Sequence, residues 1–157
     1  MISDEHKNLL FQASIFSGLT SEQISGVLES AKEVVFQAGD TIIQEGDEGG
    51  ELYVIVEGSV QIEKKAGEDL TIKIAHSEKK GMMIGEMSLI DMKPRSASVR
   101  ANSDVTMIML ERRDLADLFD KDPKILATIS LNIARALSVR LRSSNEMFSE
   151  FFNNFTA

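Results

Sequence analysis

Eight short runs of β-favouring residues, separated by polar and glycine-containing turns, fill the middle of this 157-residue chain. Seven of the ten glycines lie between Gly39 and Gly81, where tight turns need the positive φ that glycine adopts without strain. Strands this short and this often interrupted predict an antiparallel, jelly-roll-like fold of about eight strands. The runs are 34–37, 41–44, 52–57, 59–64, 70–75, 82–84, 97–101 and 105–110.

Helical periodicity borders this β-rich block on both sides. Apolar residues from Leu9 to Phe16 fall at helical spacing and predict one helix. Thr20 and Gln23 form a capping box, which predicts a second helix that runs to about residue 30. A short helix is expected after residue 110, and Pro123 then opens a long one, because proline is tolerated in a first turn. The predicted fold class is mainly β with flanking helices, an antiparallel β-roll.

The long C-terminal helix carries an apolar stripe over about seven turns. A small β-core cannot cover a helix of this length. The uncovered apolar face therefore predicts a parallel homodimer, in which two copies of this helix pair about a two-fold axis. The stripe consists of Leu126, Ile129, Ile133, Leu137 and Leu141.

The end of the same helix is rich in phenylalanine. Residues 147–155 hold four of the eight phenylalanines in the chain. Exposed aromatic side chains at this density are typical of an interface. Three interpretations stay open here: the end of the paired helices, a docking surface for a downstream effector protein, and a disordered tail.

Composition narrows the classes of function. The net charge of −8 argues against direct DNA binding, which depends on Lys and Arg side chains that neutralise phosphates. No apolar run approaches the length of a membrane span, and the polar, acidic N-terminus does not read as a signal peptide. Cysteine is absent, which suits a reducing compartment and favours the cytoplasm. His6 and His76 are isolated, and the chain has no P-loop and no nucleophile elbow, so we expect no enzyme, no metal and no cofactor.

Residues 84–99 carry the most specific chemistry. An apolar strand end reaches Gly85, about one helical turn follows, and Pro94-Arg95 precedes the next strand. Backbone N–H groups at a helix start, close to one arginine, suit a phosphate group. Glu86 in the same loop does not suit an anion alone, but a carboxylate accepts hydrogen bonds from hydroxyl groups. The segment therefore predicts a ligand that carries both a phosphate and a hydroxyl.

This segment resembles the phosphate-binding cassette of cyclic nucleotide-binding domains, whose pattern runs Gly-Glu-apolar-small-Leu, a short spacer, and Pro-Arg-small-Ala. The glycine framework at 39–47 and 52–60 is similar to that family too, and the resemblance covers residues 33–110 and both helical flanks. It implies one domain over 1–157, with N-terminal helices at 1–32 and a β-roll at 33–110 that contains the cassette. Residues 111–155 are then the C-terminal, dimerising helices.

The resemblance also assigns roles within the site. Arg95 is expected to bind the phosphate through its planar fork, and Glu86 to accept a hydrogen bond from the ribose 2′-hydroxyl. Gly85 lets the backbone approach the sugar, and Ser96 donates to a phosphate oxygen or a base edge. The residues expected to contact the ligand are Ile62, Ile84, Gly85, Glu86, Met87, Ser88, Arg95, Ser96, Ala97 and Arg140.

Recognition of the base is where the chain departs from the family. Arg140 and Leu141 stand where the bacterial cAMP receptors have a Thr-Ser pair that reaches the adenine. Arg140 is expected either to meet the purine or to be a solvated helix arginine. Ala136 replaces an arginine that holds the cassette glutamate in the family, so this contact is expected to be lost.

The sequence therefore predicts a regulatory sensor that binds a cyclic purine nucleotide. Ser96 favours cAMP over cGMP, because the bacterial cAMP receptors resemble this chain in having a serine at the matching place of the cassette. The alternative is a dimeric interaction or scaffold domain whose pocket binds nothing and whose long helix and Phe-rich end contact partners. Transcription factors of the family continue into a helix-turn-helix domain, which this chain does not contain. It is expected to be a one-domain sensor or the sensor part of a longer protein.

Overall fold

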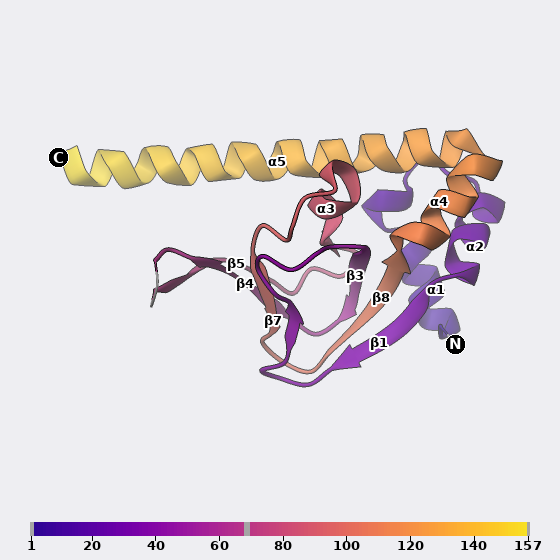
Figure 1. Cartoon of the computed structure of the whole chain (residues 1–157), viewed down its shortest axis with the longest axis horizontal. Coiled ribbons are helices and arrows are strands. Elements are labelled where there is room, and N and C mark those ends of the chain that lie inside the picture. The colour runs from indigo at the N-terminus through magenta and orange to yellow at the C-terminus, as the bar shows by residue number, and fades with distance from the viewer. Residues whose placement is uncertain (1, 68–69, 157) are drawn as a thin grey trace.

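Two four-stranded antiparallel sheets form the body of the molecule in the computed structural model, which describes residues 2–67 and 70–156 (Figure 1). The first sheet has the order β1-β8-β3-β6 and the second the order β2-β7-β4-β5. The eight predicted strands are confirmed, each to within two residues at either end. Their bounds are β1 Lys32–Phe36, β2 Thr41–Ile43, β3 Glu51–Glu57, β4 Val60–Lys65, β5 Thr71–Ser77, β6 Met83–Ile84, β7 Ser98–Ala101 and β8 Val105–Glu111.

Strand β3 is buried on both of its faces, and this divides the core into two parts. Because successive side chains of a strand point to opposite faces, Leu52 and Val54 pack against the helices while Tyr53 and Ile55 point into the β-roll. The cluster around Tyr53 and Ile55, the inner cluster, is thus enclosed by the two sheets. The cluster around Leu52 and Val54, the outer cluster, lies between one sheet and the helices.

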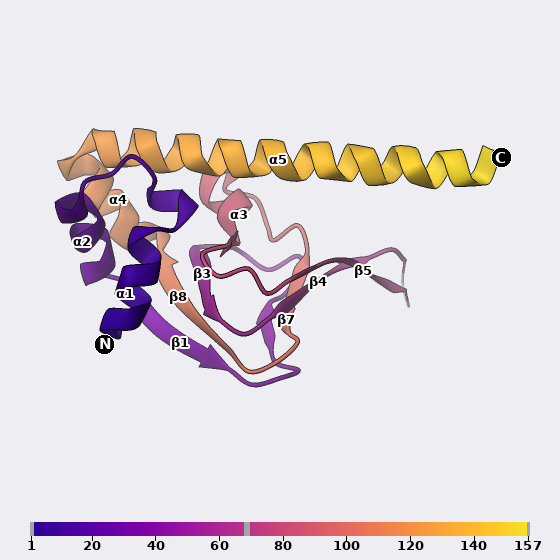
Figure 2. The ribbon, with the colours of Figure 1, turned by 180° about the vertical axis from the view of Figure 1, so that it is seen from behind.

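Helices α1, α2 and α4 gather at one end of the first sheet, where α5 begins, as Figures 1 and 2 show. The single helix predicted from Leu9 to Phe16 is wrong, because α1 ends at Phe11 and a separate 3-10 turn, η1, follows. Leu10, Ala13 and Phe16 are nevertheless buried and Leu9 is partly buried, which explains the periodicity. The capping box is confirmed, since Thr20 Oγ1 accepts from Gln23 N at 3.2 Å and Gln23 Oε1 from Thr20 N at 3.0 Å. The helices are α1 Asp4–Phe11, η1 Ser14–Phe16, α2 Ser21–Glu29, α3 Glu86–Asp91, α4 Arg112–Lys121 and α5 Pro123–Thr156.

Helix α5 packs on the body with its first half and projects beyond it with its second (Figure 1). Ile129 and Ile133 are buried in the core of their own chain, so the prediction that they face a second copy is wrong. Asn132 fixes this half by donating from Nδ2 to the carbonyl oxygens of Ile15 and Ser17, at 2.9 and 2.8 Å. Within the described residues, no helix is both long enough and apolar enough to cross a bilayer.

Candidate ligand-binding site

Gly85 joins β6 to α3 in a conformation that only glycine accepts without strain. Its φ is +81°, in the left-handed region. A Cβ at this position would lie 2.6 Å from Arg95 Nη1 and 2.8 Å from the carbonyl oxygen of Glu51. The glycine therefore makes the turn into α3 and also leaves the room in which the Arg95 guanidinium lies. Its expected approach to a sugar stays a prediction.

Arg95 lies under this turn with only 5% of its side chain exposed. Its Nη1 donates to the carbonyl oxygen of Gly85 at 3.0 Å and to Ser88 Oγ at 2.9 Å. Its Nη2 donates to the carbonyl oxygen of Glu51 at 2.9 Å and to Glu51 Oε2 at 2.8 Å. The planar fork is thus held by α3 on one side and by the start of β3 on the other.

The loop between β2 and β3 fixes the backbone on which Arg95 stands. Gly46 N donates to the carbonyl oxygen of Arg95 at 2.9 Å, and Arg95 N donates to that of Asp47 at 2.8 Å. Further along, Gly49 fits between the cassette side chains, since a Cβ there would lie 2.3 Å from Ser88 Oγ. This loop and the cassette, almost fifty residues apart in the chain, therefore form one unit.

Glu86 begins α3 and is buried, with 3% of its side chain exposed. Its Oε1 accepts from Nη1 of Arg140 at 2.5 Å, and Nη2 of Arg140 donates to the carbonyl oxygen of Met83 at 2.6 Å. The expected loss of an arginine contact to this glutamate is wrong, because Arg140, one turn after Ala136, supplies it. Arg140 is therefore not a solvated helix arginine, and the contact with the base expected as its alternative stays a prediction.

Lys64, which the sequence did not predict as a site residue, binds the other side of the cassette. Lys64 Nζ donates to the carbonyl oxygen of Ser96 at 2.6 Å and pairs with Glu45 Oε1 at 2.7 Å. The hydrogen bond from Lys64 lowers the pKa of Glu45 below its ordinary value. The side chain of Ser96 is exposed and its Oγ lies 3.5 Å from the sulfur of Met87. The only signal in the sequence that could have pointed to Lys64 is strand alternation, which places it on the same face of the strand as Ile62.

The remaining candidate residues line the roll beside the cassette. Ile84 is buried in the inner cluster, and Ile62 is half-buried against it, opposite Val99 in the sheet register. Tyr53 completes this wall, and burial raises the pKa of its hydroxyl. Met87 is exposed on α3, and Ala97, immediately before β7, is half-buried. The cassette thus borders an apolar interior.

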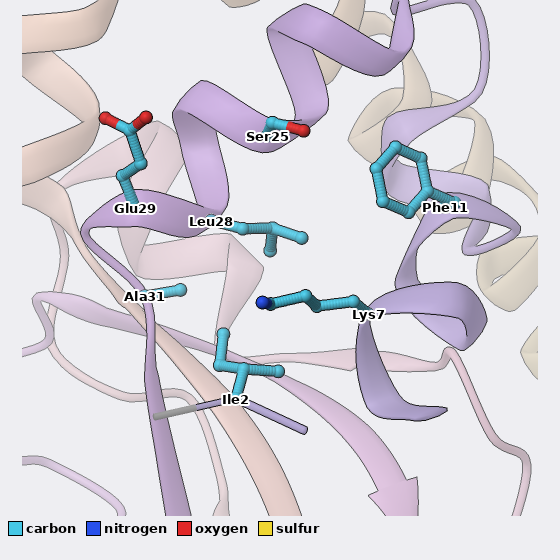
Figure 3. A pocket seen from close by; sticks show the side chains of 7 residues that line it. All are labelled: Ile2, Lys7, Phe11, Ser25, Leu28, Glu29 and Ala31. Carbon is cyan, nitrogen blue, oxygen red and sulfur yellow. The ribbon is translucent and has the colours of Figure 1, made fainter. Parts of the chain in front are cut away.

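Two hollows in the surface lie away from Arg95. One, of about 350 Å³, lies between α1 and α2, and the Lys7 side chain extends into it (Figure 3). The other, of about 360 Å³, runs between α3 and α5 and is lined by apolar residues such as Ile90 and Leu126. Neither hollow contains the charged groups of the cassette. Among the described residues, no cluster of acidic, His or Cys side chains could hold a metal ion.

Comparison with known proteins agrees with this geometry. Residues 33–122 match the family described as the cyclic nucleotide-binding domain. The chain belongs to this family.

Curated relatives include a CRP-like cAMP-activated global transcriptional regulator of Mycobacterium tuberculosis, 30% identical over 145 residues. The match covers 90% of this chain and 61% of the relative. A cAMP-dependent protein kinase regulatory subunit of Hypocrea atroviridis is 36% identical over 105 residues, which cover 67% of this chain and 21% of the relative. The chain therefore spans about three fifths or less of the length of these relatives.

Solved structures share the fold. The N-terminal domain of a transcriptional regulator from Streptomyces coelicolor A3(2) matches with a TM-score of 0.72 and 31% identity, over 88% of this chain and 95% of that one. A cyclic nucleotide-binding domain from Methylobacillus flagellatus matches with a TM-score of 0.80 and 26% identity, over 92% of this chain and 80% of that one. The predicted β-roll with flanking helices is confirmed.

Proposed function

We propose that this protein binds a cyclic purine nucleotide, cAMP in preference to cGMP, and acts as a regulatory sensor. The observation that carries the proposal is the pair of buried charged side chains at α3, Arg95 beneath Gly85 and Glu86 at the first helical position. An arginine and a carboxylate in one short segment match a ligand with a phosphate and a hydroxyl. The cAMP-related names of the Mycobacterium and Hypocrea relatives agree with this choice.

The roles follow from the chemistry of each group. Arg95 supplies the charge-assisted donors for the cyclic phosphate, and Glu86 accepts a hydrogen bond from the ribose 2′-hydroxyl. Arg140 neutralises Glu86, so the carboxylate does not repel the incoming anion. We propose that Arg140 acts through Glu86 and joins the ligand to α5. Gly85, Ser88 and the other cassette residues shape the site around the phosphate and sugar.

Base preference is assigned to the exposed edge of the cassette. Ser96 is exposed beside Met87, and its hydroxyl can donate to a purine edge or to a phosphate oxygen. The apolar wall of Ile62 and Ile84 accepts the rest of the nucleotide. The preference for cAMP rests on the likeness of Ser96 to the bacterial receptors.

We further propose a parallel homodimer through α5. From Leu137 onward, Leu141, Ser144, Phe148 and Phe151 follow at alternating spacings of four and three residues, which is the seam of a two-stranded coiled coil. Leu141, Phe148 and Phe151 are exposed. Because Arg140 connects this helix to Glu86, a nucleotide that changes the cassette also changes the helix pair and what its end presents to an effector protein.

The alternative function is an interaction domain that binds no nucleotide and uses α5 alone. The exposed apolar side chains of Val139, Leu141 and Phe148 favour an interface on this helix in either case. The domain organisation over 1–157 and the cytoplasmic location remain predictions, and we assign no catalytic role to any residue.

Isothermal titration calorimetry with cAMP, cGMP and 5′-AMP tests the proposal. We expect one saturable site per chain with the affinity order cAMP, cGMP, 5′-AMP, since the open monophosphate carries a second charge and a different shape. A stronger response to cGMP would reverse only the base preference. No heat with either cyclic nucleotide at millimolar concentration would leave the interaction domain as the better interpretation.

A further inference from the structure

Glu51 already neutralises the arginine that the proposed function assigns to phosphate. Its Oε2 lies 2.8 Å from Arg95 Nη2 and also accepts from the backbone N of Gly50 at 3.3 Å. The two terminal nitrogens of Arg95 therefore make four hydrogen bonds within the protein. Of these four, the bond to the Glu51 carboxylate is the one made with an anion.

A carboxylate and a phosphate oxygen compete for the same partner. Both are anions that take their strongest hydrogen bonds from a guanidinium. Two anions side by side on one buried guanidinium repel each other, because the surroundings of Arg95 screen charge less than water does. A phosphate that binds the terminal nitrogens of Arg95 therefore competes with the carboxylate of Glu51.

The side chain of Glu51 is the part that is able to move. It is 41% exposed, so a rotation carries it into water, whereas the Arg95 side chain is 5% exposed. The backbone beside Glu51 is fixed, since Arg112 N donates to the carbonyl oxygen of Gly50 at 2.7 Å and Arg112 Nη2 donates to that of Gly49.

Arg95 keeps its position when the carboxylate leaves. The carbonyl oxygens of Gly85 and Glu51 and the hydroxyl of Ser88 remain as acceptors, and two of the three are main-chain atoms. Loss of the Glu51 carboxylate therefore frees one N–H of the fork without misplacing the fork.

We propose that Glu51 is an affinity-setting residue of this site: its carboxylate occupies Arg95 in the ligand-free protein and is displaced when a phosphate binds. The inference rests on the proposed function, which it deepens by naming the group that opposes binding. Glu51 precedes the buried part of β3 and belongs to no motif of the cassette.

The chain offers a matched control for the test. Glu111 lies directly opposite Glu51 in the β3–β8 register, but pairs with Lys32 and Arg113 instead of Arg95. Glu51→Gln and Glu111→Gln each remove one negative charge from neighbouring places. We expect Glu51→Gln to lower the Kd for cAMP by about fivefold or more, because a neutral amide is displaced more easily than a carboxylate, and Glu111→Gln to stay within about twofold of the parent.

An unchanged or weaker affinity of Glu51→Gln relative to Glu111→Gln would overturn the inference. Far-UV circular dichroism checks that both variants fold. If Glu51→Gln does not, Glu51→Ala replaces it, because alanine has no carboxylate to compete for Arg95 and carries the same prediction.

A second probe separates this inference from the proposed function. If no variant binds cAMP, the proposed function fails, and inorganic phosphate then tests Glu51 alone. We expect phosphate, against chloride at equal ionic strength, to raise the Tm of Glu51→Gln more than that of the parent. The double variant Glu51→Gln, Arg95→Ala should lose this increase. Equal increases in the parent and in Glu51→Gln would contradict the competition.

Discussion

Arg140 in α5 and Glu86 in α3 form an ion pair in which Nη1 and Oε1 lie 2.5 Å apart, although the two residues are 54 positions apart in the chain. The carboxylate is almost fully buried, while the Arg140 side chain is 36% exposed. A buried carboxylate needs a partner, because burial of an unpaired charge costs several kcal/mol. The ion pair therefore joins the start of the cassette helix to the long helix, and the two are expected to respond to a ligand together.

Arg140→Ala should lower the free energy of unfolding by about 1–3 kcal/mol, since it leaves Glu86 buried without its cation; the partial exposure of Arg140 moderates the loss. Arg142→Ala, two residues along on the exposed face of the same helix, is the matched control and should change it by less than about 0.5 kcal/mol. Urea unfolding measures the free energy of unfolding of both variants. Equal effects of the two substitutions would mean that the ion pair contributes no stability.

Glu86→Ala should weaken cAMP binding and leave 2′-deoxy-cAMP nearly unaffected. The 2′-hydroxyl is the donor assigned to this carboxylate, and a ligand without it has nothing to lose. Calorimetry with both ligands on both proteins makes the comparison, and Glu86→Gln controls for the loss of Arg140 pairing. Equal weakening of the two ligands would show that Glu86 does not bind the ribose.

Alanine substitutions at three glycines should separate the cost of backbone strain from the cost of steric collision. Gly39 has a φ of +93° with open space around its α-carbon, so Gly39→Ala should cost about 1–2 kcal/mol from strain alone. Gly49→Ala should cost about 1–3 kcal/mol from collision with Ser88. Gly85→Ala combines both effects and should be the least stable in thermal unfolding. A Gly85→Ala protein no less stable than Gly39→Ala would contradict the packing described around Arg95.

Leu141→Asp and Phe148→Asp should dissociate the proposed dimer and leave the fold of each chain intact, because both side chains are exposed. Ser143→Asp adds the same charge away from the seam and should stay dimeric. Ile133→Glu is expected to unfold the protein, since Ile133 is fully buried in its own chain. Analytical ultracentrifugation with and without cAMP measures the oligomeric state of each variant. A parent chain that is monomeric at high micromolar concentration in both conditions would rule out the dimer.

The strands and the central cassette residues were predictable because their signals are local. Glycine spacing and short β-rich runs indicate where each strand lies to within two residues, and the Gly-Glu and Pro-Arg motifs point to Gly85, Glu86 and Arg95 as candidates. The capping box at Thr20 is also a local signal. Each depends on neighbours within a few positions, which a single sequence contains.

Features that depend on tertiary packing were not predictable. The stripe of α5 is apolar along its length, and periodicity does not say that Ile129 and Ile133 face the core of their own chain. Arg140 meets Glu86 only because α5 crosses α3 at one particular turn. Glu51 is an ordinary acidic residue in the sequence, and only the fold brings it to Arg95.

Calorimetric titration of cAMP into the parent protein, Arg95→Ala and Arg100→Ala tests the nucleotide site most directly. Arg100, five residues along the same segment, is an exposed arginine paired with Glu63 and serves as the control. We predict saturable binding to the parent and to Arg100→Ala, with an affinity at least about tenfold lower for Arg95→Ala, since a charge-assisted bond to phosphate is lost. Binding to Arg95→Ala as tight as to the parent would contradict the assignment of Arg95 to the phosphate.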